Sequence, residues 1–263
     1  MRIFAFALFI GAVTAASPVA GQAPSFEAAS IKPNTSGDLR ARGGTRGRAY
    51  NAVNMPLRRI IATAYDLQLE EFRLVGDRPL LAQRFDIVAT IPENVSPRQV
   101  PVMLRRLLAD RFKLIVHAET RDASVLSLTL ERRDGRLGPN LRRAAVDCAA
   151  AEAAGRAIAP PEPGQPAICE SEISDSIKGR GQPLSSLARM LTPFVQRRVV
   201  DGTGLTGGFD FDLRFDGAAA GPGVDSTSAL VTALQDQLGL KLESMRAPVE
   251  FVVIDSVEAP APD

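Results

Sequence analysis

His117 is the only histidine of the chain, so it is the one imidazole available for acid–base chemistry. Glu119 and Arg121 follow at i+2 and i+4, a spacing that places the three side chains on one face of a strand. A histidine beside a carboxylate can act as a general base. A solvent-exposed hairpin face gives the same pattern, and the chain contains no G-x-S-x-G nucleophile elbow. We therefore predict a candidate binding group at these three residues and no catalytic residue.

Three carboxylates alternate along another predicted strand. Asp210, Asp212 and Asp216 share one face with Arg214. Such a set can recruit a hard cation or act as a carboxylate pair. The intervening guanidinium neutralises part of the charge, and the wet face of a half-buried strand accounts for all four side chains. The sequence therefore predicts no metal site, and we expect no cofactor.

The stretch RARGGTRGR, residues 40–48, is rich in arginine and glycine. In a cytosolic protein it would indicate nucleic acid, but it lacks the aromatic residues of a base-stacking platform. We predict a flexible, solvated loop and no nucleic-acid partner. Outside the cytoplasm, the anion available to it is an envelope polymer or a lipid head group.

The first residues have the three-part layout of a secretory signal peptide. Arg2 precedes an apolar run over residues 3–13, which is too short for a permanent membrane span, and small residues follow. We predict that residues 1–22 are a signal peptide, cleaved between Ala16 and Ala23. The mature protein is then periplasmic or secreted and has no stable membrane span.

Two cysteines, Cys148 and Cys169, lie in a segment rich in alanine and proline. In an oxidising compartment such a pair forms a disulfide by default. A redox or metal pair would be indicated by C-x-x-C spacing or a nearby histidine, and the segment has neither. The predicted bridge closes a loop of about twenty residues, which stabilises by roughly 3 kcal/mol in the chain-entropy model.

Four helices are predicted from apolar stripes with helical spacing. Ser96 is the expected cap of the second helix, Pro193 is expected to end the third, and Gly239 is expected to close the fourth. The stripes are Leu57, Ile60, Ile61, Ala64 and Tyr65; Val100, Met103, Leu104, Leu107 and Leu108; Leu184, Leu187, Ala188 and Leu191; Leu230, Ala233, Leu234 and Leu238.

Strands are predicted where apolar and polar residues alternate, most clearly over residues 85–91 and 209–215. Two hairpins are also expected. The first would turn at Asp122-Ala123, and the second at Ala247-Pro248.

The predicted elements come in the same order in both halves of the chain. The sequence therefore predicts an α+β fold of two duplicated β-α-β-β-α-β-β units, with helices packed on mainly antiparallel sheets. The first α+β repeat, with an N-terminal strand and the Arg/Gly loop, would span 23–135. An Ala/Pro-rich linker with the cysteine pair would span 136–172, and the second repeat 173–263.

Gly202, Gly204 and Gly207 have the G-x-G-x-x-G spacing of a dinucleotide-binding turn. That fingerprint needs a helix directly after the glycines. Here the strand-like stretch FDFDLRF follows instead. The glycines are therefore predicted to form a tight connection between two strands, and no phosphate site.

Several segments resemble one family when taken together and in order. They include FEAASIKPN at 26–34, NMPLRRIIATAYDL at 54–67, RFDIVATIPE at 84–93, MLRRLLADRFKLIVHAETRD at 103–122 and VVDGTGLTGGFDFDLRF at 199–215. The chain resembles the soil-associated domain of unknown function, a family of exported proteins abundant in some soil bacteria. The resemblance implies export and carries over no catalytic residue.

Each half also looks similar to the short N-terminal domain of secretins and TonB-dependent receptors, through the order of its helices and strands. That module is a small α+β domain that engages protein partners in the periplasm. The resemblance implies an envelope protein as partner, and an extracellular polymer is the other expectation. We therefore predict a non-enzymatic binding or protein-interaction module of the cell envelope. The alternative is an extracytoplasmic hydrolase that uses His117.

Overall fold

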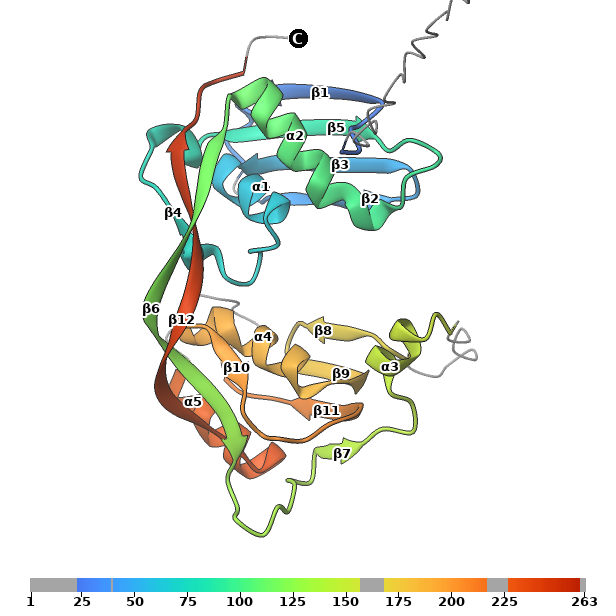
Figure 1. The fold of residues 1–263 in the computed structure, drawn as a ribbon, viewed down its shortest axis with the longest axis vertical. Helices are drawn as coiled ribbons and strands as arrows, with labels where there is room; N and C mark the ends of the chain where they lie inside the picture. Colours follow the sequence, from blue (N-terminus) through green and yellow to red (C-terminus); the bar gives the residue numbers. More distant parts are fainter. Residues whose placement is uncertain (1–22, 39, 157–167, 217–226, 261–263) are drawn as a thin grey trace, which may run out of the picture.

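The computed structural model describes residues 23–38, 40–156, 168–216 and 227–260. They form two lobes joined by a long, twisted, two-stranded ribbon (Figure 1). Helices pack on three mainly antiparallel sheets, so the predicted α+β class is confirmed. The predicted signal peptide, residues 1–22, lies outside the described residues. None of the described helices is long and apolar enough to cross a membrane.

The upper lobe contains a four-stranded antiparallel sheet in the order β1-β5-β3-β2. Helices α1 and α2 lie across one of its faces (Figure 1), and three short 3-10 turns complete the lobe. The elements are β1 (Ala28–Pro33), β2 (Arg42–Arg46), β3 (Ala49–Pro56), α1 (Leu57–Ala64), η1 (Glu71–Arg73), η2 (Pro79–Ala82), β5 (Arg84–Thr90), η3 (Pro97–Gln99) and α2 (Val100–Phe112).

The upper core forms where the apolar stripes of helices α1 and α2 pack against the apolar face of strand β5. Phe85 and Ile87 of β5 are buried in one cluster with Ile61 of α1 and Leu104 of α2. Ser96 caps the 3-10 turn η3 that leads into α2, because its side chain accepts a hydrogen bond from the backbone N–H of Arg98, whereas Gln99 at the start of α2 makes no side-chain cap.

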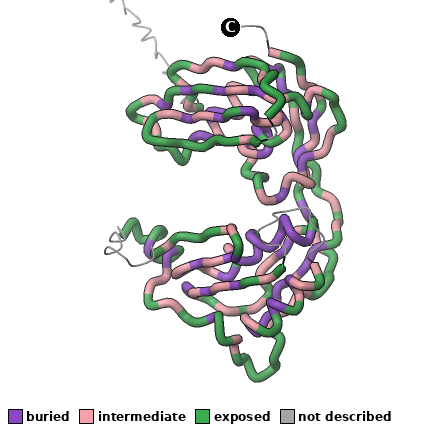
Figure 2. The backbone as a smooth tube through the Cα atoms, turned by 180° about the vertical axis from the view of Figure 1, so that it is seen from behind, coloured by how far each residue is buried: buried purple, intermediate pink, exposed green. Residues whose placement is uncertain are grey.

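The lower lobe contains a second four-stranded antiparallel sheet, in the order β7-β11-β9-β8. Its core is separate from the upper one, and Figure 2 shows buried positions gathered in both lobes. The elements are β7 (Leu141–Arg143), α3 (Cys148–Ala153), β8 (Ser171–Ile173), β9 (Ile177–Gln182), α4 (Leu184–Val195), β11 (Phe209–Leu213), α5 (Thr227–Ala233) and the π-helical turn η4 (Leu234–Leu238).

Helix α4 does not end at Pro193, as the sequence suggested, but continues to Val195 and ends at Gln196 in the left-handed conformation. The missing donor and the ring of a proline disturb the helical turn before it, so the two residues that follow can still be helical. Thr192 helps to hold this end, because its hydroxyl donates to the carbonyl of Ala188 and accepts from the N–H of Val199. The helix is therefore anchored to the strand that follows it.

The two predicted hairpins are wrong. Neither Asp122-Ala123 nor Ala247-Pro248 is a turn: both lie inside the single long strands β6 (Ile115–Leu130) and β12 (Leu240–Ser256). These strands pair with each other antiparallel over their whole length, with Asp122 opposite Pro248. The local turn signals were misleading because a partner distant in sequence satisfies the backbone of each strand.

The ribbon exchanges strands between the lobes. The start of β6 and the end of β12 lie in the upper lobe, where β4 (Leu74–Val75) pairs with β12. The end of β6 and the start of β12 lie in the lower lobe, where β10 (Val199–Asp201) pairs with β6. Each lobe therefore contains one strand segment from the other half of the chain.

The matching sheet orders of the two lobes favour the duplication, which stays a prediction, as do the domain limits. The segment expected as a linker contains β7 and α3. Its strand β7 pairs with β11 and so extends the lower sheet.

Gly202, Gly204 and Gly207 lie between β10 and β11, as predicted for a connection between two strands. Gly204 and Gly207 have φ of +70° and +97°, which glycine adopts without strain. Asp201 shapes the turn by accepting hydrogen bonds from the N–H and hydroxyl of Thr203.

The Arg/Gly stretch is not a flexible loop. Residues Arg42–Arg46 form strand β2, which pairs with β3 at the edge of the upper sheet. Arg48 fixes the turn that follows, because its guanidinium donates to the carbonyl of Ile91 and pairs with Glu27 and Glu93. A two-residue turn and backbone pairing order the stretch despite its glycine content.

Candidate functional site

His117, Glu119 and Arg121 lie on β6 with the predicted alternation, but they form two separate pairs. Nδ1 of His117 lies 2.9 Å from a carboxylate oxygen of Asp255 on β12. The histidine side chain is 53% exposed. Asp255 was not singled out in the sequence, because only the pairing of β6 with β12 brings it beside the histidine.

Arg121 turns to Glu119 and binds it with two hydrogen bonds of 2.9 and 2.7 Å. These hydrogen bonds lower the pKa of Glu119 and raise the pKa of Arg121. The guanidinium also lies 5.1 Å from the ring centroid of Phe251. The pair thus satisfies its own charges on an exposed face of the ribbon, where solvent weakens such interactions.

The aspartates of β11 are also paired. Asp210 accepts hydrogen bonds from Arg142 and from the backbone N–H of Gly181, and Asp212 pairs with Arg214. Across the part of the chain that the structure describes, no group of three or more histidine, cysteine, aspartate and glutamate side chains is placed to hold a metal ion.

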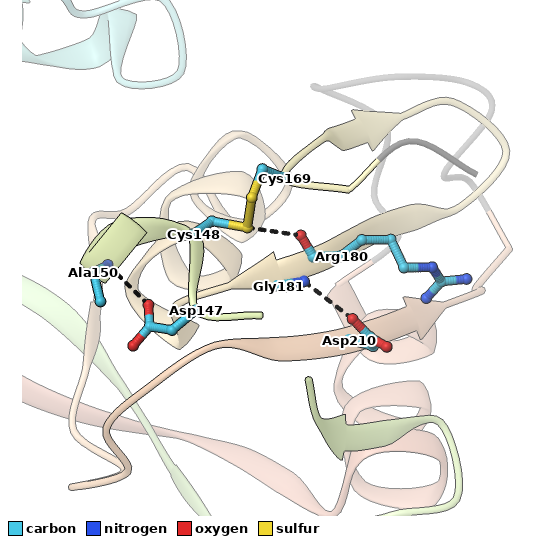
Figure 3. Close-up of a disulfide and its surroundings, with 7 residues drawn as sticks. All are labelled: Asp147, Cys148, Ala150, Cys169, Arg180, Gly181 and Asp210. Atoms are coloured by element: carbon cyan, nitrogen blue, oxygen red, sulfur yellow. Dashed lines mark hydrogen bonds between the residues drawn. A yellow bond between two sulfur atoms is a disulfide. The ribbon is translucent and has the colours of Figure 1, made fainter. Parts of the chain in front are cut away.

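Cys148 and Cys169 form the predicted disulfide, with their Cα atoms 5.5 Å apart (Figure 3). The bridge ties the start of α3 to the strand region before β8. Asp147 caps the same helix by accepting from the N–H of Ala150. Cys148 Sγ lies 3.5 Å from the carbonyl oxygen of Arg180; a disulfide sulfur carries no proton, so this is a packing contact.

The disulfide also lines a hollow of about 700 Å³, to which both lobes contribute residues. Arg98 reaches it from the upper lobe, and Arg156 and Arg189 from the lower lobe. Arg98 pairs with Glu152 of α3 at 2.6 Å, which links the two lobes. The polar residues Ser171, Gln182 and Ser186 complete much of its lining.

The charges in this hollow are only partly satisfied. Among the described residues of its lining, Glu152 is the one acidic side chain, against three arginines. Arg156 and Arg189 are exposed, and neither side chain has a partner among the described residues. The arrangement suits an anion, because guanidinium groups bind carboxylate, phosphate and sulfate oxygens in pairs.

A second basic hollow, of about 510 Å³, has a structural role instead. It lies beside the start of α1. Arg58 there donates to the carbonyls of Glu71, Leu74 and Gly76, and Arg84 to that of Asn54. These guanidinium groups hold backbone segments together, so fewer of their donors remain for a ligand.

A family model described as "Protein of unknown function (DUF3738)" matches residues 58–257. That is most of the chain. The protein belongs to the DUF3738 family. Comparison with the curated proteins and with the solved structures gives no match.

The DUF3738 match covers the lower lobe, the ribbon and the upper lobe from α1 onward, but not strands β1 to β3. It includes the described residues that line the hollow. The sequence analysis missed the arginines of this site. Arg98, Arg156 and Arg189 come from three separate segments, and each is an ordinary exposed arginine in its own segment. The fold of the lower lobe brings Arg156 and Arg189 to the same hollow, and Arg98 joins them from the upper lobe.

Proposed function

We propose that this DUF3738 protein is a non-enzymatic binding module of the cell envelope whose main site takes an anionic ligand. The hollow between the lobes carries the proposal. The described part of its lining has three arginines and one glutamate, a net charge of 3 − 1 = +2. A ligand with at least two carboxylate, phosphate or sulfate groups matches that charge.

Export supports the choice of ligand class. A disulfide is typical of oxidising compartments, and the predicted signal peptide directs the chain there. Outside the cytoplasm, an anionic extracellular polymer or an acidic group of an envelope protein is available to the site. This proposal includes three further points: the protein comes from a soil bacterium, it is exported, and its halves are similar to the secretin and TonB-receptor domains.

Calorimetric titration of the mature protein with inorganic pyrophosphate and with citrate tests the site. We expect binding that weakens as salt rises, because the attraction is electrostatic. The double variant Arg156→Ala/Arg189→Ala should lose it. Arg133→Ala is the matched control, since Arg133 is exposed and does not line the hollow.

Glu152→Gln sharpens this test. The substitution removes the carboxylate that competes for Arg98, so affinity should rise by roughly up to fivefold, the value of an exposed ion pair. If neither anion binds the wild type, or if the double variant and Arg133→Ala bind alike, the hollow is not the site.

A second candidate function, an extracytoplasmic hydrolase, rests on the pairing of His117 with Asp255. The carboxylate at Nδ1 orients the ring, and the half-exposed side chain has no other hydrogen-bond partner among the described residues, so Nε2 is available as a general base. Turnover of p-nitrophenyl acetate that disappears in both His117→Ala and Asp255→Asn would favour this function over the binding module.

A further inference from the structure

Strand β2 leaves one edge of the upper sheet open. It pairs with β3 on one side, it ends the strand order of its sheet, and all five of its residues are exposed. An exposed strand edge presents backbone N–H and C=O groups to which another extended chain can pair. This surface is separate from the hollow between the lobes.

The register identifies which groups face outward. Gly47 and Arg48 form the two-residue turn between β2 and β3, and Gly47 has the positive φ of +57° that a type II′ turn needs at its first position. Arg46 and Ala49 are therefore a hydrogen-bonded pair, and bonded pairs alternate from there. The N–H and C=O of Gly43 and Thr45 consequently point away from β3.

The middle of this edge carries no side chains. Gly43 and Gly44 have no side chains, and a Cβ built on Gly44 meets nothing within 4 Å. Gly43 could hardly be replaced, because its Cβ would lie 2.8 Å from the carbonyl oxygen of Asn51. The edge thus lets another backbone approach closely.

Two arginines beside the edge favour one kind of incoming strand. Cross-strand pairing places Arg42 and Arg46 on the same face as Val53 and Ala49, away from buried Tyr50. Neither arginine forms an ion pair with a described residue, whereas Arg48 is held by two glutamates. An incoming strand with acidic residues opposite Arg42 and Arg46 matches this face.

We propose that the open edge of β2 takes an acidic extended segment of a partner protein as a fifth strand of the upper sheet. The backbone groups of Gly43 and Thr45 give the pairing, and the two arginines select acidic side chains at alternate positions. A small or apolar side chain fits between them, opposite Gly44.

A labelled peptide containing Glu-Thr-Val-Thr-Glu, followed by fluorescence anisotropy, tests the proposal on the mature full-length protein. Thr45→Pro removes one outward N–H, and proline is tolerated there because the group does not pair with β3. Affinity should fall roughly two- to tenfold, as for one lost hydrogen bond. Thr45→Val keeps the N–H and should bind like the wild type.

Two further measurements separate backbone pairing from charge alone. Arg42→Ala/Arg46→Ala should weaken binding and flatten its dependence on salt. The peptide Lys-Thr-Val-Thr-Lys should not bind, and neither should Glu-Pro-Val-Pro-Glu, in which proline removes the N–H groups opposite Gly43 and Thr45. Thermal melts of every variant should match the wild type.

The proposal is overturned if the acidic peptide does not bind, if Thr45→Pro binds it as well as Thr45→Val, or if the lysine peptide binds equally. Self-association through β2, seen as dimers by sedimentation and abolished by Thr45→Pro, would name a second copy as the occupant and also overturn it. None of these outcomes depends on the arginines of the interlobe hollow.

Discussion

At the residue scale, the packing of Phe211 depends on a missing side chain. Its ring is fully buried, and its cross-strand partner on β9 is Gly179. A Cβ on that glycine would lie 2.3 Å from the ring. Only glycine at 179 leaves room for phenylalanine at 211, so the two residues form one unit of the lower core.

Phe211→Ala should therefore lower the free energy of unfolding by about 3–5 kcal/mol, through lost burial and the cavity left behind. Urea denaturation followed by circular dichroism measures it. Val88→Ala is the control, since Val88 is 56% exposed and its change should stay within about 0.5 kcal/mol. Equal effects of the two substitutions would contradict the description of this core.

Tyr50 gives a prediction about pH. Its side chain is 5% exposed, and burial raises its pKa to about 12 from 10.0. Because the folded state disfavours the ionised phenol, this contribution to stability is fully present below pH 10 and is lost as pH rises toward 12. The free energy of unfolding should fall by about 2–3 kcal/mol in total, because each pKa unit corresponds to about 1.36 kcal/mol.

Denaturation midpoints measured from pH 8 upward should show this decline, and Tyr50→Phe should remove it. The matched control is Tyr65→Phe, because Tyr65 is only half buried. A decline that persists in Tyr50→Phe would assign the alkaline sensitivity to another group.

Sequence could predict single site residues but not their partners. The face of His117, Glu119 and Arg121 follows from strand periodicity alone. Asp255 and the arginines of the hollow become neighbours only through contacts between distant segments. Arg98 and Glu152 belong to different lobes, and no local pattern connects them.

At the element scale, helices and single strands were predictable because their signals repeat within a few residues. The apolar stripe of α1 and the alternation of β5 both correspond to buried faces. Strand pairing was not predictable in the same way. Pro248 looked like a turn residue, yet it lies in the ribbon where β12 has only β6 as a neighbour, so its missing N–H can face outward.

Removal of the disulfide tests how much the tethering of α3 contributes to the free energy of unfolding. The bridge joins residues 21 apart, so Cys148→Ala/Cys169→Ala should cost about 3 kcal/mol in the chain-entropy model. Guanidinium denaturation compares this variant with the oxidised and the reduced wild type. Reduction of the wild type should give a similar loss; no change in either case would show that the bridge constrains little.

At the scale of the whole molecule, the strand exchange makes the lobes interdependent. Val252 and Ile254 of β12 belong to the upper core, although they lie near the end of the chain. We predict that a fragment of residues 23–135, the first expected repeat, shows no cooperative thermal melt by itself.

Addition of a peptide of residues 247–260 should restore the melt, because it supplies the absent strand. A peptide of residues 238–246 is the control, since that segment of β12 pairs with the lower half of β6. A fragment that melts cooperatively without any peptide would show that each half folds by itself and that the exchange is dispensable.

The shared ribbon also sets an order of events during synthesis. Arg73 donates a hydrogen bond to the carbonyl of Glu250, 177 residues later, and contacts so distant in sequence slow folding. Because β12 follows every other described element and completes both cores, neither core can close until that strand has left the ribosome. A nascent chain that stays unfolded for so long can still be translocated through a membrane channel. This property suits a protein that, as we propose, crosses a membrane before it folds.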